Sequence, residues 1–218
     1  MIGRYCELNN LEEIKDLKLG MDFIKIPSGD ITNGQLLEFI KKRKEKTILS
    51  TGASNMQEVI TATKYLNKKK GRLILLHCSS SYPAKLNELN LKVISSYKNF
   101  FNCEVGYSDH SLSLVTPVIA VSLGATIIEK HFTINRKLIG PDHKASVTGK
   151  ELKEMILKIR ETEKILGSNQ KIVTKSERIN QKVIRKSIYA NHSIKKGNIF
   201  SSKNLIYMFV GVMLTVKE

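Results

Sequence analysis

Short apolar runs alternate with amphipathic segments along most of the chain. Short β-rich runs predict β-strands at residues 23–26, 47–49, 73–76, 104–107 and 125–128, and the run at 73–76 is continuously apolar, as in strands that parallel sheets bury on both faces. Apolar positions at helical spacing predict helices at about residues 34–44, 56–68 and 89–101, between residues 110 and 125, and at residues 150–166. Five strand-helix steps at intervals of about 25 residues predict a parallel α/β sheet, either open or closed as a barrel.

The last of these helices marks the end of the α/β region. Thr148 is its predicted N-cap, and Gly167 is its predicted stop. The sequence then turns polar and loses its periodicity, which indicates a linker. After it, residues 183–190 and 195–200 predict short strands with a glycine turn. We therefore divide the chain into an α/β domain at residues 1–167, a linker at residues 168–182 and a small β-rich domain at residues 183–218.

Composition narrows the class of protein. The chain has 218 residues and is 41% hydrophobic, which is enough for a substantial core. Its three cysteines, Cys6, Cys78 and Cys103, are odd in number and widely spaced, which favours a reducing compartment without a disulfide framework. No signal-peptide pattern opens the chain, and its apolar runs are too short for a membrane span. We expect a cytoplasmic protein without a membrane partner.

The net charge of +16 raises the question of a nucleic-acid partner. Lysine and arginine are spread along the chain, however, and form tight runs only at residues 41–44 and 68–70. Both runs lie at the ends of predicted helices, where cations favour the helix dipole. We expect no nucleic-acid partner, although a basic surface would help to gather anionic substrates.

Polar and small residues cluster just after the predicted strands. Because parallel strands end on one face of the sheet, these residues should lie close together. They are Lys25, Ser28, Ser50, Thr51, Gly52, Ser79, Ser80, Tyr82, Ser108, Asp109, His110, Glu129, His131 and Asp142. A lysine and several hydroxyls suit a phosphate or carboxylate, and two histidines suit a divalent ion that acts as a Lewis acid. The set predicts a phosphorylated small acid beside a metal-polarised carbonyl.

Taken singly, these residues are weak evidence for a site, because a purely structural interpretation is also open. Lys25 could equally be a snorkelling edge residue, and residues 50–52 could form only a turn. His77 directly follows an apolar strand, which is more typical of a packed, hydrogen-bonded histidine than of a ligand. The pair His110 and His131, in matching positions after successive strands, favours a shared ion.

Six ordered motifs resemble those of the sialic acid synthase family, which comprises N-acetylneuraminate synthase and its legionaminate and pseudaminate relatives. The resemblance extends from about residue 11 to residue 205. The motifs are KIPSGD at 25–30, ILSTG at 48–52, LLHCSSSYP at 75–83, VGYSDH at 105–110, IEKHFT at 128–133 and GPDHKAS at 140–146.

This resemblance implies a fold and an activity. The family builds a (β/α)₈ barrel of the TIM type, followed by a small antifreeze-like SAF domain. Its members condense phosphoenolpyruvate with an N-acetylated hexosamine such as N-acetylmannosamine, giving N-acetylneuraminate or legionaminate and phosphate. They use Mn²⁺ or a similar ion such as Mg²⁺ or Co²⁺, and they form homodimers. The residues after GPD favour the neuraminate and legionaminate branches over the pseudaminate branch.

The resemblance also implies roles for individual residues. His110 and His131 match the metal ligands, and Tyr82 and Asp142 match contacts to the sugar. The residues that match the phosphoenolpyruvate site are Lys25, Ser28, Ser50, Ser108 and Ser80, the last standing where some members carry Asn. Two carboxylates are the candidates for catalysis, Glu129 and Asp30, and the second stands where many members carry the longer Glu.

The chain also departs from the family pattern. Its five predicted strands correspond to the fourth through eighth strands of the barrel, and the sequence after Leu205 diverges. We therefore expect a partial barrel of about five of eight βα units, with little synthase activity alone and with a separate chain as a candidate source of the other strands. The alternatives are a non-catalytic binding or assembly module that retains the fold, a pseudaminate synthase, and a basic nucleic-acid binder.

Overall fold

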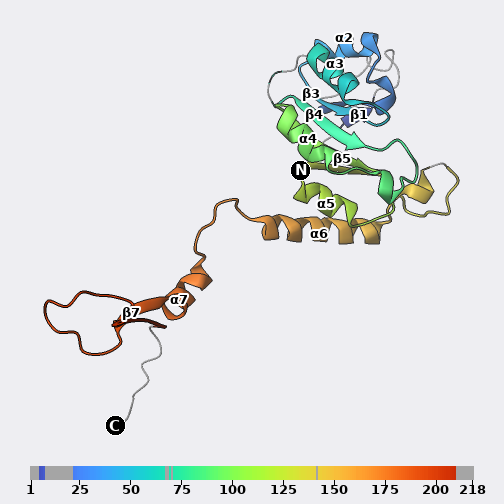
Figure 1. The fold of residues 1–218 in the computed structure, drawn as a ribbon. Coiled ribbons are helices and arrows are strands. Elements are labelled where there is room, and N and C mark those ends of the chain that lie inside the picture. Colours follow the sequence, from blue (N-terminus) through green and yellow to red (C-terminus); the bar gives the residue numbers. More distant parts are fainter. Residues whose placement is uncertain (1–4, 8–21, 67–68, 70, 141, 210–218) are drawn as a thin grey trace. The chain divides into compact units, whose positions relative to one another are not determined.

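Parallel strands that follow one another along the chain form a six-stranded sheet, in the order β1 to β6 (Figure 1). The computed structural model describes residues 5–7, 22–66, 69, 71–140 and 142–209. The strands are β1 (Tyr5–Glu7), β2 (Phe23–Ile26), β3 (Lys46–Ser50), β4 (Leu73–Cys78), β5 (Glu104–Asp109) and β6 (Ile127–Lys130). Strand β1 adds one strand to the five that were predicted, because its three residues carry no apolar pattern.

A helix follows each strand from β2 to β6, as expected for repeated βα units, and the last of these helices ends the part of the chain that forms the six-stranded sheet. These helices are α2 (Gly34–Lys41), α3 (Met56–Leu66), α4 (Val93–Phe100), α5 (Thr116–Ser122) and α6 (Gly149–Leu166). The apolar stripes of α2 to α5 pack against one face of the sheet and form the main core, and α6 packs against α5. This core includes Ile24, Ile26, Leu37, Ile40, Leu49, Val59, Leu66, Leu75, Ile94, Val105 and Tyr107, all of which are buried.

The other face of the sheet carries the residues that alternate with this core. Ile48, Ile74 and Leu76 form a small second cluster there, with Phe23 and Ile127 packed against it. Further along the same strands, toward their carboxyl ends, this face carries polar side chains. Because successive strand residues point to opposite faces, the strands place apolar packing at one end of this face and polar groups at the other. The fold is thus α/β, with a partial barrel of the TIM type.

The ends of the elements show how local sequence sets their lengths. Strand β6 ends at Lys130, two residues later than predicted, because its pairing with β5 continues to Asp109 and Lys130. Helix α6 begins behind Thr148, as predicted, and Thr148 forms a capping box with Glu151. The helix ends at Leu166, and Gly167 follows at φ 52°.

The chain divides into two compact units, Met1–Gly167 and Ser168–Glu218. The second unit contains α7 (Lys175–Ile184), β7 (Lys186–Ala190) and β8 (Leu205–Phe209), and the two strands pair antiparallel. The segment predicted as a linker, residues 168–182, contains most of α7, because Thr174 and Glu177 form a capping box that starts a helix. The predicted strand at residues 195–200 is also wrong, since β8 supplies the partner of β7.

Among the described residues, none of the helices combines the length and the apolar character that a membrane crossing requires. Residues 210–218, the last part of the predicted C-terminal domain, lie outside the described residues.

Candidate active site

A cavity of about 230 Å³ lies at the carboxyl ends of strands β2 to β6. Eleven residues were assigned a role by the resemblance, and nine of them line this cavity. Three further residues without an assigned role also line it. The nine are Lys25, Ser28, Ser50, Ser80, Tyr82, Ser108, His110, Glu129 and His131, and the other three are Pro27, Gly29 and Cys78. The strand ends thus bring together residues that are up to about a hundred positions apart, as the parallel sheet requires.

The two predicted metal-binding imidazoles face each other in this cavity. The ring centroids of His110 and His131 are 5.4 Å apart, and the rings are inclined by 64°. The ring of Tyr82 lies 4.2 Å from that of His110 and 5.7 Å from that of His131. The two histidines therefore lie in the same cavity, and the half-exposed ring of Tyr82 lies beside them.

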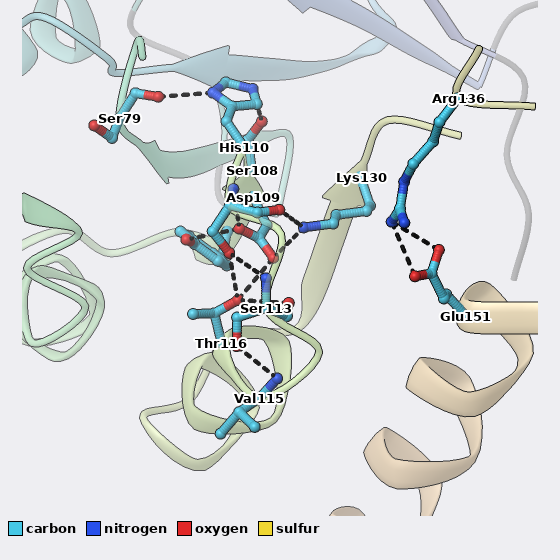
Figure 2. A network of polar contacts seen from close by, with 12 residues as sticks. Ser79, Ser108, Asp109, His110, Ser113, Val115, Thr116, Lys130, Arg136 and Glu151 are labelled. Atoms are coloured by element: carbon cyan, nitrogen blue, oxygen red, sulfur yellow. Dashed lines mark hydrogen bonds and ion pairs between the residues drawn. The ribbon is translucent and has the colours of Figure 1, made fainter. Parts of the chain in front are cut away.

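Hydrogen bonds define the tautomer of His110. Its Nδ1 is 2.7 Å from the carbonyl oxygen of Ser79 (Figure 2), and a carbonyl can only accept, so Nδ1 carries the proton of the neutral ring. Burial lowers the pKa of His110, and the nearby His131 lowers it further. The ring is therefore neutral at pH 7, and its Nε2 presents a lone pair.

Ser108 leaves that lone pair free for a ligand. The Ser108 hydroxyl donates to Oε1 of Glu129 at 2.6 Å, and it lies 3.2 Å from Nε2 of His110. A hydroxyl has one proton, and a carboxylate is the stronger acceptor, so the proton goes to Glu129. The free Nε2 lone pair of His110 and the facing imidazole of His131 fit a divalent ion. No group of three or more His, Cys, Asp or Glu residues in the described part of the chain could hold an ion, so water or a substrate would supply the other ligands.

A buried lysine supplies positive charge beside these groups. Nζ of Lys25 is 3.2 Å from Oε1 of Glu129, and the exposed fractions of the two side chains are 9% and 21%. The same Glu129 oxygen accepts the hydrogen bond from Ser108. Lys25 points from β2 into the cavity, so the interpretation of this residue as a snorkelling edge lysine is wrong.

Serine hydroxyls complete the polar wall of the cavity. Oγ of Ser50 is buried and has no hydrogen-bond partner among the described residues. Oγ of Ser28 accepts a hydrogen bond of 2.9 Å from the backbone N–H of Gly52, and it is 3.2 Å from Sγ of Cys78. The Ser50 hydroxyl lines the cavity, so it is available to hydrogen-bond a ligand there.

Two predicted site residues lie outside this cavity lining. Asp30 lies in a 3-10 helix, Ser28–Asp30, and its Oδ1 accepts a hydrogen bond of 2.9 Å from the side chain of Asn33. Asp142 is more than half exposed, and its Oδ2 is 3.9 Å from Nδ1 of His131. The structure therefore brings Glu129, and not Asp30, to the other polar groups.

The loop that leads from β6 to Asp142 and α6 is anchored by an arginine. Arg136 donates to both carboxylate oxygens of Glu151, at 2.9 and 2.8 Å (Figure 2). Its Nε donates to the carbonyl oxygen of Ser146. These bonds tie the loop to the first turn of α6.

Sequence reasoning missed Cys78 and the steric role of Gly52. Cys78 is the last residue of the apolar strand β4, and it follows Leu76 on the same face, so strand alternation was the signal that could have placed it in the site. A Cβ atom built on Gly52 would overlap Oγ of Ser80 and lie 2.9 Å from Oγ of Ser28. Gly52 is therefore needed for close approach between strands, and not only for a turn.

The structure confirms the prediction that His77 is a packed, hydrogen-bonded histidine. It is buried on the helix side of β4, its Nε2 donates to the carbonyl oxygen of Leu89 at 2.7 Å, and its ring stacks on Tyr107. Burial lowers the pKa of His77, so the folded protein holds the ring neutral while an unfolded chain would protonate it below about pH 6.5.

We expect this proton linkage to make the protein less stable in mild acid. Below about pH 6.5 the unfolded chain binds more protons than the folded one, so the free energy of unfolding falls as the pH falls. His77→Gln keeps a donor toward Leu89 without a titrating group, and we expect it to lose less stability than the wild type between pH 7.5 and pH 5.5. Thermal unfolding at both pH values measures this, and an equal loss in the two proteins would contradict the assignment.

Comparison with known proteins gives matches over most of the chain. A family model described as "NeuB family" matches residues 6–171. The chain is 47% identical over 191 residues to N,N'-diacetyllegionaminic acid synthase of Campylobacter jejuni serotype O:2, across 86% of this chain and 57% of the relative. It is 38% identical over 182 residues to pseudaminic acid synthase of Campylobacter jejuni serotype O:23/36, across 83% of this chain and 53% of the relative.

A solved structure shares the fold at similar identity. It is N-acetylneuraminic acid (sialic acid) synthetase from Leptospira borgpetersenii in complex with citrate, with a TM-score of 0.76 and 38% identity. The match covers 80% of this chain and 62% of that chain. The present chain thus spans between 53% and 62% of the length of these three proteins.

Proposed function

The chain belongs to the NeuB family, and from this membership we propose that its cavity is the phosphoenolpyruvate and metal site of a nonulosonic acid synthase. The proposed reaction joins phosphoenolpyruvate to an N-acetylated hexosamine and gives a sialic acid and phosphate. The observation that carries the proposal is the meeting of Lys25, a set of serine hydroxyls and two facing imidazoles in one cavity of about 230 Å³.

In this proposal the anionic substrate lies between β2, β3 and β5. Lys25 offers a buried positive charge, and Ser28, Ser50 and Ser108 offer hydroxyls around it. The unpartnered Oγ of Ser50 supports this placement, because a phosphate or carboxylate oxygen would satisfy it. Ser80 belongs to the same wall.

The imidazoles of His110 and His131 would hold the divalent ion, for which Mn²⁺ is our first candidate. When bound, such an ion acts as a Lewis acid toward the aldehyde of the open-chain sugar. Tyr82 and Asp142, which both lie near His131, would contact the sugar and hold its carbonyl carbon toward phosphoenolpyruvate.

The condensation forms a bond between C3 of phosphoenolpyruvate and the aldehyde carbon, and it leaves cationic character at C2. Water then captures C2, and the C2–O bond to phosphate breaks. Glu129 is the carboxylate that the cavity offers for this stage, held by Lys25 and Ser108. We propose that it stabilises the cationic carbon and accepts a proton from the attacking water.

Two finer assignments follow from the resemblance. We propose a legionaminate or neuraminate product before a pseudaminate product, which the higher identity to the legionaminate enzyme supports. We also propose that the unit from Ser168 is SAF-like, which its antiparallel pair β7 and β8 supports.

Binding measurements on the purified chain test the proposed site directly. We expect isothermal titration calorimetry to detect phosphoenolpyruvate binding, and we expect Mn²⁺ to bind and to be removed by a chelator. A panel of N-acetylated hexosamines, with phosphate release and product mass as readouts, tests the reaction itself. Binding without turnover would favour the non-catalytic alternative, and absence of both kinds of binding would contradict the proposed site.

A single substitution tests the metal ligands. His110→Gln removes the Nε2 lone pair that faces the cavity, and we expect the affinity for Mn²⁺ to fall about a hundred-fold or more. The control is His143→Gln, because His143 lies outside the cavity lining and hydrogen-bonds to Thr133. Titration of Mn²⁺ by electron paramagnetic resonance measures both variants, and equal affinities in the two would rule out His110 as a ligand.

A further inference from the structure

A buried ion pair lies directly behind the candidate site. Nζ of Lys130, on β6, is 2.7 Å from Oδ2 of Asp109, on β5, and the exposed fractions of the two side chains are 2% and 0%. The two residues are register partners at the last paired position of their strands. Neither belongs to the cavity lining, because both point to the helix side of the sheet.

Each carboxylate oxygen of Asp109 accepts two hydrogen bonds. Its Oδ1 accepts hydrogen bonds from the hydroxyl of Tyr107 at 3.1 Å and from the N–H of Ser111 at 2.8 Å. Its Oδ2 accepts from the hydroxyl of Thr116 at 2.8 Å, in addition to Lys130. Figure 2 shows Asp109 between Lys130 and Thr116, which starts helix α5. Lys130 also donates to the carbonyl oxygen of Ser111.

A contribution to folding stability does not by itself explain why a buried ion pair stands at this position. Taking two charges out of water costs about as much as their attraction returns, so a buried pair is often no more stabilising than apolar residues of the same size. What a fully hydrogen-bonded pair does provide is a fixed relative position of the groups that it joins. Here it joins the last residues of two strands.

The residues beside this pair carry the chemistry. Ser108 and Glu129 are the preceding register partners, on the site side of the sheet, and their side chains hydrogen-bond at 2.6 Å. The residues that directly follow the pair are His110 and His131, whose rings face each other. The strand ends are thus joined on both faces, at two successive positions.

We propose that Asp109 and Lys130 are positioning residues that hold the ends of β5 and β6 together, so that His110 and His131 stay at the separation that one divalent ion requires. The proposal deepens the proposed function and rests on it for the identity of the ligand. It assigns to the pair no contact with the substrate or the ion.

Neutralising both partners at once tests the proposal without leaving an unpaired buried charge. The double variant Asp109→Asn with Lys130→Met should fold, because replacing both members of a buried pair is tolerated better than replacing one. We expect its Mn²⁺ affinity to fall about ten- to a hundred-fold, as typically occurs when groups behind metal ligands are changed. The matched control is Arg136→Met with Glu151→Gln, which removes another ion pair of the same unit.

A spectroscopic readout separates positioning from stability. Nitrogen-15 spectra of the imidazoles report the tautomer of His110, which donates from Nδ1 to Ser79 in the wild type. We expect the double variant to show a mixture of tautomers or broadened His110 signals, and the control pair to leave them unchanged. A folded double variant with wild-type His110 signals and wild-type Mn²⁺ affinity would overturn the proposal.

Two further outcomes remain decisive. If the wild type binds no Mn²⁺, the proposed metal site fails, but the His110 signals still decide whether the pair positions the ring. If the double variant does not fold, Thr116→Val serves instead, since it removes one of the donors to Asp109 and leaves both charges in place. Unchanged His110 signals in Thr116→Val would then overturn the proposal, and altered signals would support it.

Discussion

Gly52→Ala is expected to lower the affinity for phosphoenolpyruvate about a hundred-fold or more. The added Cβ would overlap Oγ of Ser80, and it would lie 2.9 Å from Oγ of Ser28 and 3.0 Å from Sγ of Cys78. Two of these groups are hydroxyls of the proposed anion wall, and the N–H of Gly52 itself donates to Ser28. Overpacking of this kind costs about 1–3 kcal/mol, and misplacing the ligand's hydrogen-bond donors adds to that cost.

Calorimetric titration with phosphoenolpyruvate measures this effect, and thermal unfolding shows whether the variant is folded. The matched control is Gly34→Ala, because a Cβ on Gly34 meets no atom within 4 Å and Gly34 lies outside the cavity lining. A folded Gly52→Ala protein with wild-type affinity would show that the ligand does not depend on the Ser28 and Ser80 wall.

Lys25→Met is the second change with a large expected effect. It removes the positive charge that faces the cavity, and it leaves Glu129 without its buried cationic partner at 3.2 Å. We expect the affinity for phosphoenolpyruvate to fall about a hundred-fold, since a charge-assisted contact to the substrate is lost. We also expect the free energy of unfolding to fall by about 3 kcal/mol, as is typical when one member of a buried pair is removed.

Lys46→Met provides the comparison for this variant. Nζ of Lys46 is 3.9 Å from Glu104, and both side chains are nearly half exposed, so this pair should contribute at most about 1 kcal/mol. Chemical denaturation and calorimetry compare the two variants directly. Equal effects of the two substitutions on ligand affinity would contradict the role of Lys25 in the site.

Much of the sheet and of the site could be predicted from the sequence. Strands β2 to β5 lie on β-rich runs, of which Leu73–Leu76 is continuously apolar, and small or polar residues come at or just after the end of each, so the parallel sheet and its functional edge follow from pattern alone. His110 and His131 could be paired because each comes directly after one of two neighbouring strands.

The remaining features depend on contacts that pattern does not encode. Nothing in the residue types Asp109 and Lys130 distinguishes a buried ion pair from ordinary strand-end charges, since only the register brings them together. Asp30 was placed in the site by its motif, but the 3-10 turn directs its carboxylate to Asn33. Helix α7 was missed because its polar composition outweighed the Thr174 and Glu177 capping signal.

The alternation of cavity-facing and helix-facing side chains along β5 and β6 limits how these strands can change in evolution. Ser108 and His110 face the cavity, while Asp109 between them faces the helices, and Glu129, Lys130 and His131 repeat the arrangement. Inserting or deleting one residue in either strand would turn its ligands toward the helices and its buried charge toward the cavity. Evolutionary change in these two strands is therefore restricted to substitutions that preserve their length.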